Sequence, residues 1–257
     1  METLVRLEAK KRVQVQVLSD LEKISHKAAE MFVNISGSCI ASQRKFSAAL
    51  SGGSTPRRLY ILLSSDRYRN QVHWPSIHFF WVDERCVPKE HEESNFKTAF
   101  DTLLSKVPIP DENIHRIRGE EDPERGARDY EEDVRKFFEM AGLPVFDLVI
   151  LGMGADGHTA SLFPGSKSLD ERVRLALPVY LEKPNWNRIT LTLPVLNNAA
   201  QIIFLVAGQS KADMVWEILG GGQKKDRYPA GRINSVHRSI TWLIDQGAAR
   251  KLKGIKT

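Results

Sequence analysis

The feature that most constrains the fold is an apolar strand followed directly by a glycine-rich loop. Residues 146–151 are apolar apart from one acid, which is typical of a strand buried in a parallel sheet. The loop at 152–161 contains three glycines, which permit a sharp turn, and presents Asp156 and His158 two positions apart. A strand that ends in such a loop predicts a reaction centre at the carboxyl edge of an open α/β sheet.

Two other interpretations of this loop are open. Gly152, Gly154 and Gly157 match the dinucleotide-binding fingerprint literally, but that fingerprint requires the last glycine to open a helix. Pro164 and Gly165 follow too soon for a long helix, so we expect no dinucleotide. A purely structural turn is the second alternative. A lone histidine would favour the turn, whereas an aspartate–histidine pair after a buried strand favours chemistry.

Short apolar segments alternate with longer amphipathic ones along the whole chain. Strands are expected at 13–17, 45–50, 77–82, 146–151, 188–193, 202–207 and 239–244, and helices at 20–42, 94–105, 123–140 and 210–219. This alternation predicts βαβ units and hence an α/β fold with a mostly parallel, Rossmann-like sheet flanked by helices. We expect one domain over residues 1–257, with 1–12 as a flexible N-terminal extension.

The composition is that of an ordinary globular protein, with 42% hydrophobic and 27% charged residues. No apolar run approaches the ~20 residues of a membrane helix, and the polar N-terminus lacks the apolar core of a signal peptide. The two cysteines, Cys39 and Cys86, suggest neither a disulfide framework nor a zinc cluster. We therefore expect a cytoplasmic protein that is a monomer or a small homo-oligomer and has no membrane partner.

Charge and histidine spacing narrow the class of ligand further. The net charge is +5, but the basic residues are scattered and form no stripe interleaved with aromatics, so we expect no nucleic-acid partner. A small anionic substrate is also compatible with the charge, but we expect most of the lysines and arginines to be solvated surface residues, so that a few specific arginines matter more than the total. No metal site is predicted, because the spacing of five histidines with carboxylates and cysteines is not that of ligands: His73, His78, His91, His115 and His237.

Residues 51–56 follow a predicted strand and open a predicted helix. We expect Thr55 to be the N-cap and Pro56 the first helical residue. The amides of a first helical turn have no intrahelical partner, and the helix dipole makes this end positive, so it can bind phosphate. Gly52 and Gly53 let an anion approach the backbone, and the hydroxyls of Ser54 and Thr55 can donate. An ordinary capped helix start is the alternative.

Charged residues follow other predicted strands. Asp83 and Arg85 come directly after the strand at 77–82, where polar side chains are unusual unless they face a cleft. Arginine can contact phosphate or carboxylate through two parallel hydrogen bonds, although an internal ion pair is the alternative. Arg188 begins another strand, and Lys211 lies near the start of the helix at 210–219. A phosphate cradle, basic side chains and an Asp–His pair together predict a sugar-phosphate enzyme.

These motifs, in this order, resemble the 6-phosphogluconolactonase family over residues 45–252. The segments that carry the resemblance are 51–56, 81–88, 94–96, 146–154, 156–165 and 188–192. The resemblance implies hydrolysis of 6-phospho-D-glucono-1,5-lactone to 6-phospho-D-gluconate, in the oxidative pentose phosphate pathway, with no metal and no cofactor. It also places Asn95 in the site, together with Asp83 and Arg85.

Lactone hydrolysis needs an activated water and a substrate that is held in place. A neutral imidazole is abundant at pH 7, because histidine has an ordinary pKa of about 6.5, so His158 can be the general base. Backbone amides in the 152–157 loop, including Gly154 and Gly157, are candidate donors to the oxyanion. Asp156 either orients His158 or contacts a substrate hydroxyl. Residues 52–55 are expected to hold the phosphate with Arg188 and Lys211, and Arg85 either joins them or holds the sugar.

Two alternative functions belong to other classes. The resemblance extends to glucosamine-6-phosphate isomerases/deaminases, which carry a glutamate five residues beyond the histidine. Here that position is Phe163, and a phenyl ring cannot accept a proton. A non-catalytic sugar-phosphate-binding protein would keep the cradle but could lose Asp156 and His158. Both residues are present, so the lactonase is the favoured function.

Overall fold

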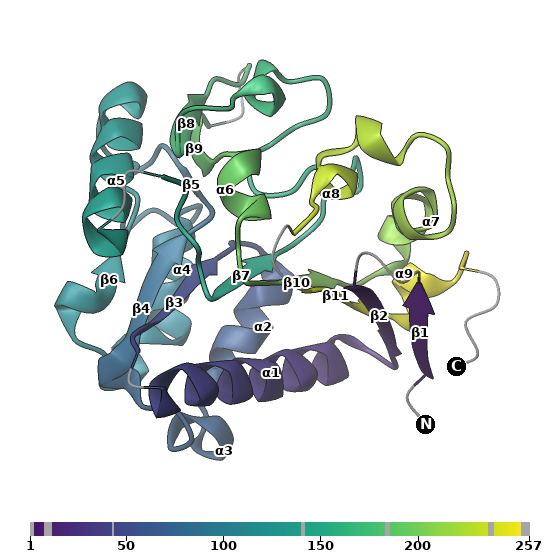
Figure 1. The fold of residues 1–257 in the computed structure, drawn as a ribbon, viewed down its shortest axis with the longest axis horizontal. Coiled ribbons are helices and arrows are strands. Elements are labelled where there is room, and N and C mark those ends of the chain that lie inside the picture. Colours follow the sequence, from purple (N-terminus) through teal and green to yellow (C-terminus); the bar gives the residue numbers. More distant parts are fainter. Residues whose placement is uncertain are drawn as a thin grey trace.

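One large sheet organises the molecule (Figure 1). The computed structural model describes residues 3–7, 12–42, 44–139, 142–182, 186–235 and 239–252. Within these ranges the sheet has eight strands in the order β1-β2-β11-β10-β7-β3-β4-β6, and their pairings are parallel except for β1 with β2. Their bounds are β1 Thr3–Leu7, β2 Arg12–Leu18, β3 Phe46–Leu50, β4 Ile77–Trp81, β6 Ile114–His115, β7 Leu148–Leu151, β10 Gln201–Val206 and β11 Ser239–Asp245. The predicted single-domain α/β fold with a mostly parallel sheet is confirmed.

Helices flank this sheet (Figure 1). The long helix α1 begins after the N-cap Asp20, whose side chain accepts the amide of Lys23, and it packs against α2 and strands β10 and β11. Phe32 of α1 lies 5.3 Å from the ring of Phe46 and 6.0 Å from that of Phe79, which places the core between helix and sheet. The helix bounds are α1 Leu21–Ala41, α2 Ser54–Leu63, α3 Asp66–Arg69, α4 Asn95–Thr102, α5 Pro123–Phe138, α6 Leu193–Asn197, α7 Ala212–Leu219, α8 Pro229–Arg232 and α9 Gln246–Ala249.

A second, three-stranded antiparallel sheet corrects two expectations. Its order is β5 (Asp83–Arg85), β9 (Arg188–Leu191), β8 (Ala176–Val179). Residues 83–85 were expected to end the strand at 77–82, and residues 188–193 were expected in the main sheet. Instead the chain changes sheets at Val82, whose amide donates to Leu50 O of β3 (2.9 Å) while its carbonyl accepts the amide of Leu191 (2.8 Å). A local apolar pattern marks a strand but does not say which sheet it joins.

Several element ends also differ from the sequence prediction. Residues 3–7, expected to be a flexible extension, pair as β1 with β2. Helix α4 ends at Thr102 and is followed by a 3₁₀ turn at Leu104–Lys106, and α7 begins at Ala212 after a 3₁₀ turn at Gln209–Lys211. Helix α5 ends at Phe138, and position 140 lies outside the described residues. No helix within the described ranges has the length and hydrophobicity needed to cross a bilayer.

Candidate active site

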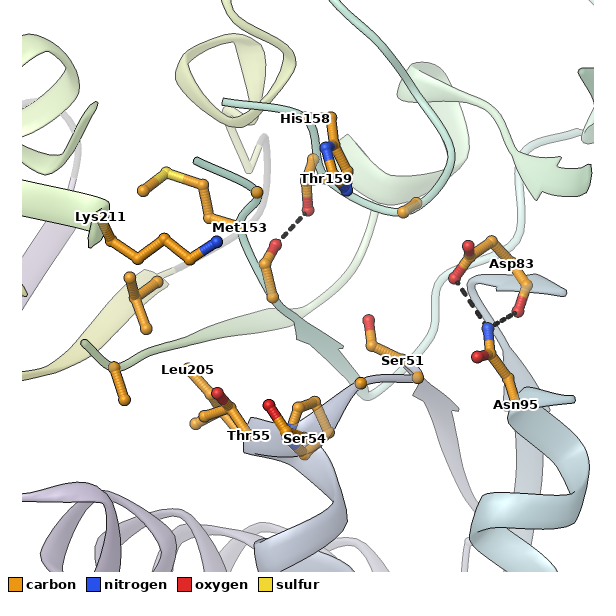
Figure 2. A pocket seen from close by; sticks show the side chains of 18 of the residues that line it. Ser51, Ser54, Thr55, Asp83, Asn95, Met153, His158, Thr159, Leu205 and Lys211 are labelled. Atoms are coloured by element: carbon orange, nitrogen blue, oxygen red, sulfur yellow. Dashed lines mark hydrogen bonds between the residues drawn. The ribbon is translucent and has the colours of Figure 1, made fainter. Parts of the chain in front are cut away.

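A cavity of about 280 Å³ lies at the carboxyl ends of β3, β7 and β10 (Figure 2). It brings together most of the residues that the sequence singled out: Gly52, Gly53, Ser54, Thr55, Asp83, Arg85, Asn95, Gly154, His158, Arg188 and Lys211. Asp156 and Gly157 do not line it. Gly152 and Met153, from the loop whose amides were expected near the oxyanion, also line the cavity. The rest of the wall was not singled out from the sequence and is formed by Ser51, Pro56, Thr159, Ala160, Leu205, Val206 and Ala207.

Asp156 lies behind His158 and binds its imidazole. Its Oδ1 is 2.6 Å from Nδ1 of His158 and also accepts the backbone amide of His158 at 3.2 Å. Burial raises the pKa of the Asp156 carboxyl, but the charge and the hydrogen bonds of His158 outweigh it, so the net pKa lies below 3.8. A carboxylate can only accept, so in the neutral imidazole Nδ1 carries the proton and Nε2 keeps the lone pair.

The loop that holds this pair depends on two glycines. A Cβ at Gly154 would lie 2.2 Å from His158 Nδ1 and 2.4 Å from Asp156 Oδ1, so a side chain there would displace the pair. Gly157 has φ +82°, a conformation that side chains disfavour. The amide of Gly154 donates to His158 O (2.9 Å), and that of Gly157 donates to Gly154 O (3.1 Å). Both amides are therefore engaged within the loop, although they were expected as oxyanion donors.

The N-terminus of α2 forms the opposite wall of the cavity. The helix begins at Ser54, two residues earlier than expected, and its N-cap is Gly53 with φ +99° and no side-chain cap. The prediction that Thr55 caps this helix is wrong, because the left-handed turn at Gly53 already starts it. Uncapped first-turn amides at the positive end of the helix dipole can receive an anion. Lys211 points into the cavity from the side opposite Asp83 and Asn95 (Figure 2).

A buried carboxylate organises the Asp83 side of the cavity. Asp83 is 5% exposed, and its Oδ2 accepts the hydroxyl of Ser161 at 2.6 Å. The side-chain amide of Asn95 donates to the Asp83 carbonyl at 2.9 Å and lies 3.4 Å from Oδ1 (Figure 2). Nη1 of Arg188 lies 4.0 Å from Oδ2. The sequence contains Ser161 within its main motif, but nothing in the motif's spacing shows that this serine reaches Asp83.

Arg85 and Arg188 are direct partners in the register between β5 and β9. Two like charges opposite one another destabilise a sheet unless other charges compensate. Burial lowers the pKa of Arg188, an effect that the charge of Asp83 opposes and that of Arg85 reinforces. The Nε atoms of both arginines are buried and have no hydrogen-bond partner among the described residues. This pair therefore has unused donors beside the cavity that suit an anionic or polar ligand.

Glu84, between Asp83 and Arg85 in β5, anchors helix α4. Its carboxylate accepts the amides of Asn95 (2.7 Å) and Phe96 (2.8 Å) and the hydroxyl of Ser94 (3.1 Å). Burial raises the pKa of Glu84 to about 7, against the opposing effect of the backbone donors. Asn95 is thereby fixed against Gly52, where a Cβ would lie 1.8 Å from Asn95 Oδ1. Glycine at 52 is thus required by the packing of Asn95.

Comparison with known proteins assigns the chain to a family. The family model described as glucosamine-6-phosphate isomerases/6-phosphogluconolactonase matches residues 19–242. The chain belongs to this family. As noted in the sequence analysis, the position five residues beyond His158, where the resemblance implies a glutamate in the deaminases, is Phe163 in this chain. The Phe163 ring lies 4.8 Å from the imidazole of His158, at an interplanar angle of 42°. It thus packs against the proposed base itself.

Several similar proteins carry the name 6-phosphogluconolactonase. "6-phosphogluconolactonase 3, chloroplastic" of Arabidopsis thaliana is 37% identical over 97% of this chain and 78% of its own length. "6-phosphogluconolactonase" of Haemophilus influenzae is 39% identical over 79% of this chain and 86% of its own. The solved structure "6-phosphogluconolactonase from Trypanosoma cruzi" superposes with a TM-score of 0.84 at 27% identity, and the match covers 96% of this chain and 99% of that one.

Proposed function

We propose that this protein hydrolyses 6-phospho-D-glucono-1,5-lactone to 6-phospho-D-gluconate, a step of the oxidative pentose phosphate pathway. The observation that carries the proposal is the Asp156–His158 pair, with its 2.6 Å contact, across a cavity from the uncapped N-terminus of α2 and Lys211. The names of the relatives support it. So does Phe163, which supplies no proton-transfer group beside His158.

The reaction follows from the chemistry of these groups. Nε2 of His158 removes a proton from water while the oxygen attacks C1 of the lactone, and Asp156 stabilises the imidazolium that forms. The carbonyl electrons move onto oxygen to give a tetrahedral oxyanion. Its collapse breaks the bond between C1 and the ring oxygen, which takes the proton back from His158. The products are a free hydroxyl and a carboxylic acid, which ionises in water.

Substrate binding is assigned to the rest of the cavity. We assign the phosphate to residues 52–55 together with Lys211 and Arg188, because amides at a helix N-terminus and cationic side chains bind phosphate strongly. Asp83, Arg85 and Asn95 contribute the wall that the sugar contacts. Binding energy from the phosphate is remote from C1 and therefore serves to orient the lactone toward His158.

Replacing His158 tests the catalytic assignment. Because a positioned general base contributes about 10²–10⁴-fold to rate, His158→Ala and His158→Gln should lose most activity while remaining folded. The assay follows hydrolysis of freshly generated 6-phosphogluconolactone above its spontaneous background, with ammonia release from glucosamine 6-phosphate as the control reaction. A folded His158→Ala protein with near-normal kcat would exclude His158 as the base.

We further propose that residues 1–257 act as one domain, as a monomer or small homo-oligomer in the cytoplasm, without nucleic-acid or membrane partners. The scattered distribution of the +5 net charge supports the absence of a nucleic-acid surface. Light scattering coupled to size-exclusion chromatography gives the oligomeric state. A fluorescent fusion tests the cytoplasmic location. Fluorescence in plastids would contradict it, and this is a relevant alternative because the Arabidopsis relative is named chloroplastic.

A further inference from the structure

A segment outside all the recognised motifs contacts the catalytic loop from behind. It comprises the 3₁₀ turn Lys225–Arg227, Tyr228 and helix α8 (Pro229–Arg232), and we call it the 225–232 segment. In Figure 1, α8 lies beside the loop that leaves β7. The contact falls on Gly157, between Asp156 and His158. The segment therefore meets the loop at the position where a displacement would alter the Asp–His geometry most.

The first contact is a hydrogen bond to the backbone. The amide of Ala230 donates to Gly157 O at 3.0 Å. The carbonyl of Gly157 and the amide of His158 belong to one planar peptide unit, so they cannot turn independently. The other end of that unit is also held, because the His158 amide donates to Asp156 Oδ1 at 3.2 Å. Ala230 thus fixes the peptide plane from which the His158 side chain departs.

The second contact is packing onto Gly157. A Cβ at Gly157 would lie 2.9 Å from both Cβ and Cδ1 of Tyr228 and from Sδ of Met214, so these side chains press on the glycine backbone. A residue with φ +82° has few neighbouring conformations, and this packing leaves it little room to change. The ring of Tyr228 therefore packs on the loop at Gly157, and neither residue lines the cavity.

The segment itself is firmly attached to the fold. Ala230 is 1% exposed and Ile233 is 6% exposed. The side chain of Asn197 donates to Arg232 O at 3.3 Å and accepts the amide of Asn234 at 2.7 Å. Asn197 ends α6, so the support for the catalytic loop leads back to a helix of the scaffold. An element anchored in this way can hold a loop within the fraction of an ångström that catalysis requires.

We propose that the 225–232 segment, through Tyr228 and the amide of Ala230, is a positioning element that orients His158 for general-base catalysis. This inference rests on the proposed role of His158. The residues proposed to bind the phosphate lie on α2, on β9 and in the turn before α7. Among the described residues, none of them forms a hydrogen bond with Tyr228 or Ala230. Loosening the segment should therefore reduce kcat and leave ligand affinity unchanged.

Two pairs of variants test the proposal. Tyr228→Ala removes the ring over Gly157, and Tyr228→Phe is its matched control because it keeps the ring. Ala230→Pro removes the amide donor, and Ala230→Gly keeps it. A misplacement of about 1 Å can reduce rate by ~10²-fold, so we expect Tyr228→Ala and Ala230→Pro to lower kcat at least tenfold. Both controls should stay within about threefold of the wild type.

The readouts separate orientation from general damage. For Tyr228→Ala and Ala230→Pro, the dissociation constant of 6-phosphogluconate, measured calorimetrically, should stay within twofold of the wild type. The acid limb of the kcat profile should move to lower pH, because a looser carboxylate contact stabilises the imidazolium less. If either variant fails to fold, Met214→Ala replaces it, with the same expectation of a selective fall in kcat.

His158→Ala, measured in parallel, distinguishes the two possible failures. If His158→Ala is inactive while Tyr228→Ala and Ala230→Pro keep wild-type kcat, the positioning proposal is overturned and the proposed function stands. If these variants lose affinity and kcat together with an unchanged pH profile, the segment has only a structural role and the proposal is again overturned. If His158→Ala keeps its activity, the general-base assignment is wrong, and the positioning proposal that rests on it is overturned as well.

Discussion

Replacing Ser161 with alanine should destabilise the protein measurably, because this hydroxyl satisfies a buried charge. Ser161 is 0% exposed, and its Oγ donates to Asp83 Oδ2 at 2.6 Å. The other side chains near this carboxylate are farther away, with Asn95 Nδ2 at 3.4 Å and Arg188 Nη1 at 4.0 Å. Hydrogen bonds to charged groups contribute about 1.5–3 kcal/mol, and alanine offers no replacement donor. The unfolding equilibrium constant should rise roughly 10- to 150-fold, since ~1.4 kcal/mol is a factor of ten.

The assay is urea unfolding at neutral pH, with Ser38→Ala as the matched control. Ser38 is an exposed residue of α1, so its replacement should change the free energy of unfolding by less than about 0.5 kcal/mol. The same preparations should show weaker binding of 6-phosphogluconate for Ser161→Ala, because Asp83 is the carboxylate beside Arg188. A loss below about 0.5 kcal/mol for Ser161→Ala would refute the argument that this bond stabilises the Asp83 charge.

Three further changes test other parts of the site. Asp156→Asn should lower kcat and move the acid limb of the rate profile to lower pH. The pKa of Asp156 is lowered in the folded protein, so its pairing with His158 stabilises the wild type above about pH 3.8. In acid unfolding, this contribution should disappear as the pH falls through the folded-state pKa of Asp156. Arg188→Ala should weaken 6-phosphogluconate by about 1.5–3 kcal/mol and gluconate by less, measured as inhibition constants; equal weakening would argue against a phosphate contact. Phe163→Glu should reduce lactonase activity without releasing ammonia from glucosamine 6-phosphate, because the new carboxylate replaces an apolar ring at a half-buried position and disturbs the packing on His158; ammonia release by the wild type would contradict the use of Phe163 as the discriminator.

The sequence predicted which segments meet at the cavity because one topological rule governs their placement. The carboxyl ends of parallel strands meet at one edge, so the segments after β3 and β7 had to lie together. Glycines in both segments marked where the backbone turns, and Gly53 and Gly157 do have positive φ. These signals are local, which is why they can be read from one sequence.

The features that the sequence did not reveal depend on partners far away in the chain. The pairing of Arg85 with Arg188, the bond from Ser161 to Asp83 and the packing of Tyr228 on Gly157 have no signature in the residues themselves. The start of α2 was misplaced for a local reason. Thr55-Pro56 is a favourable cap sequence, but the left-handed Gly53 allows the helix to begin two residues earlier. Conformational freedom at glycine therefore overrode the capping preference.

The alternation of side chains along β5 has a consequence for anyone who redesigns this cavity. Asp83 and Arg85 line the cavity, whereas Glu84 between them holds the start of α4 and with it Asn95. Substitutions at Asp83 and Arg85 change the ligand wall, whereas a substitution at Glu84 releases the start of α4, so libraries built across all three positions should yield many destabilised proteins. Met153 and Ala207 line the same cavity with apolar side chains. Those two positions are where a search for activity on other lactones should begin.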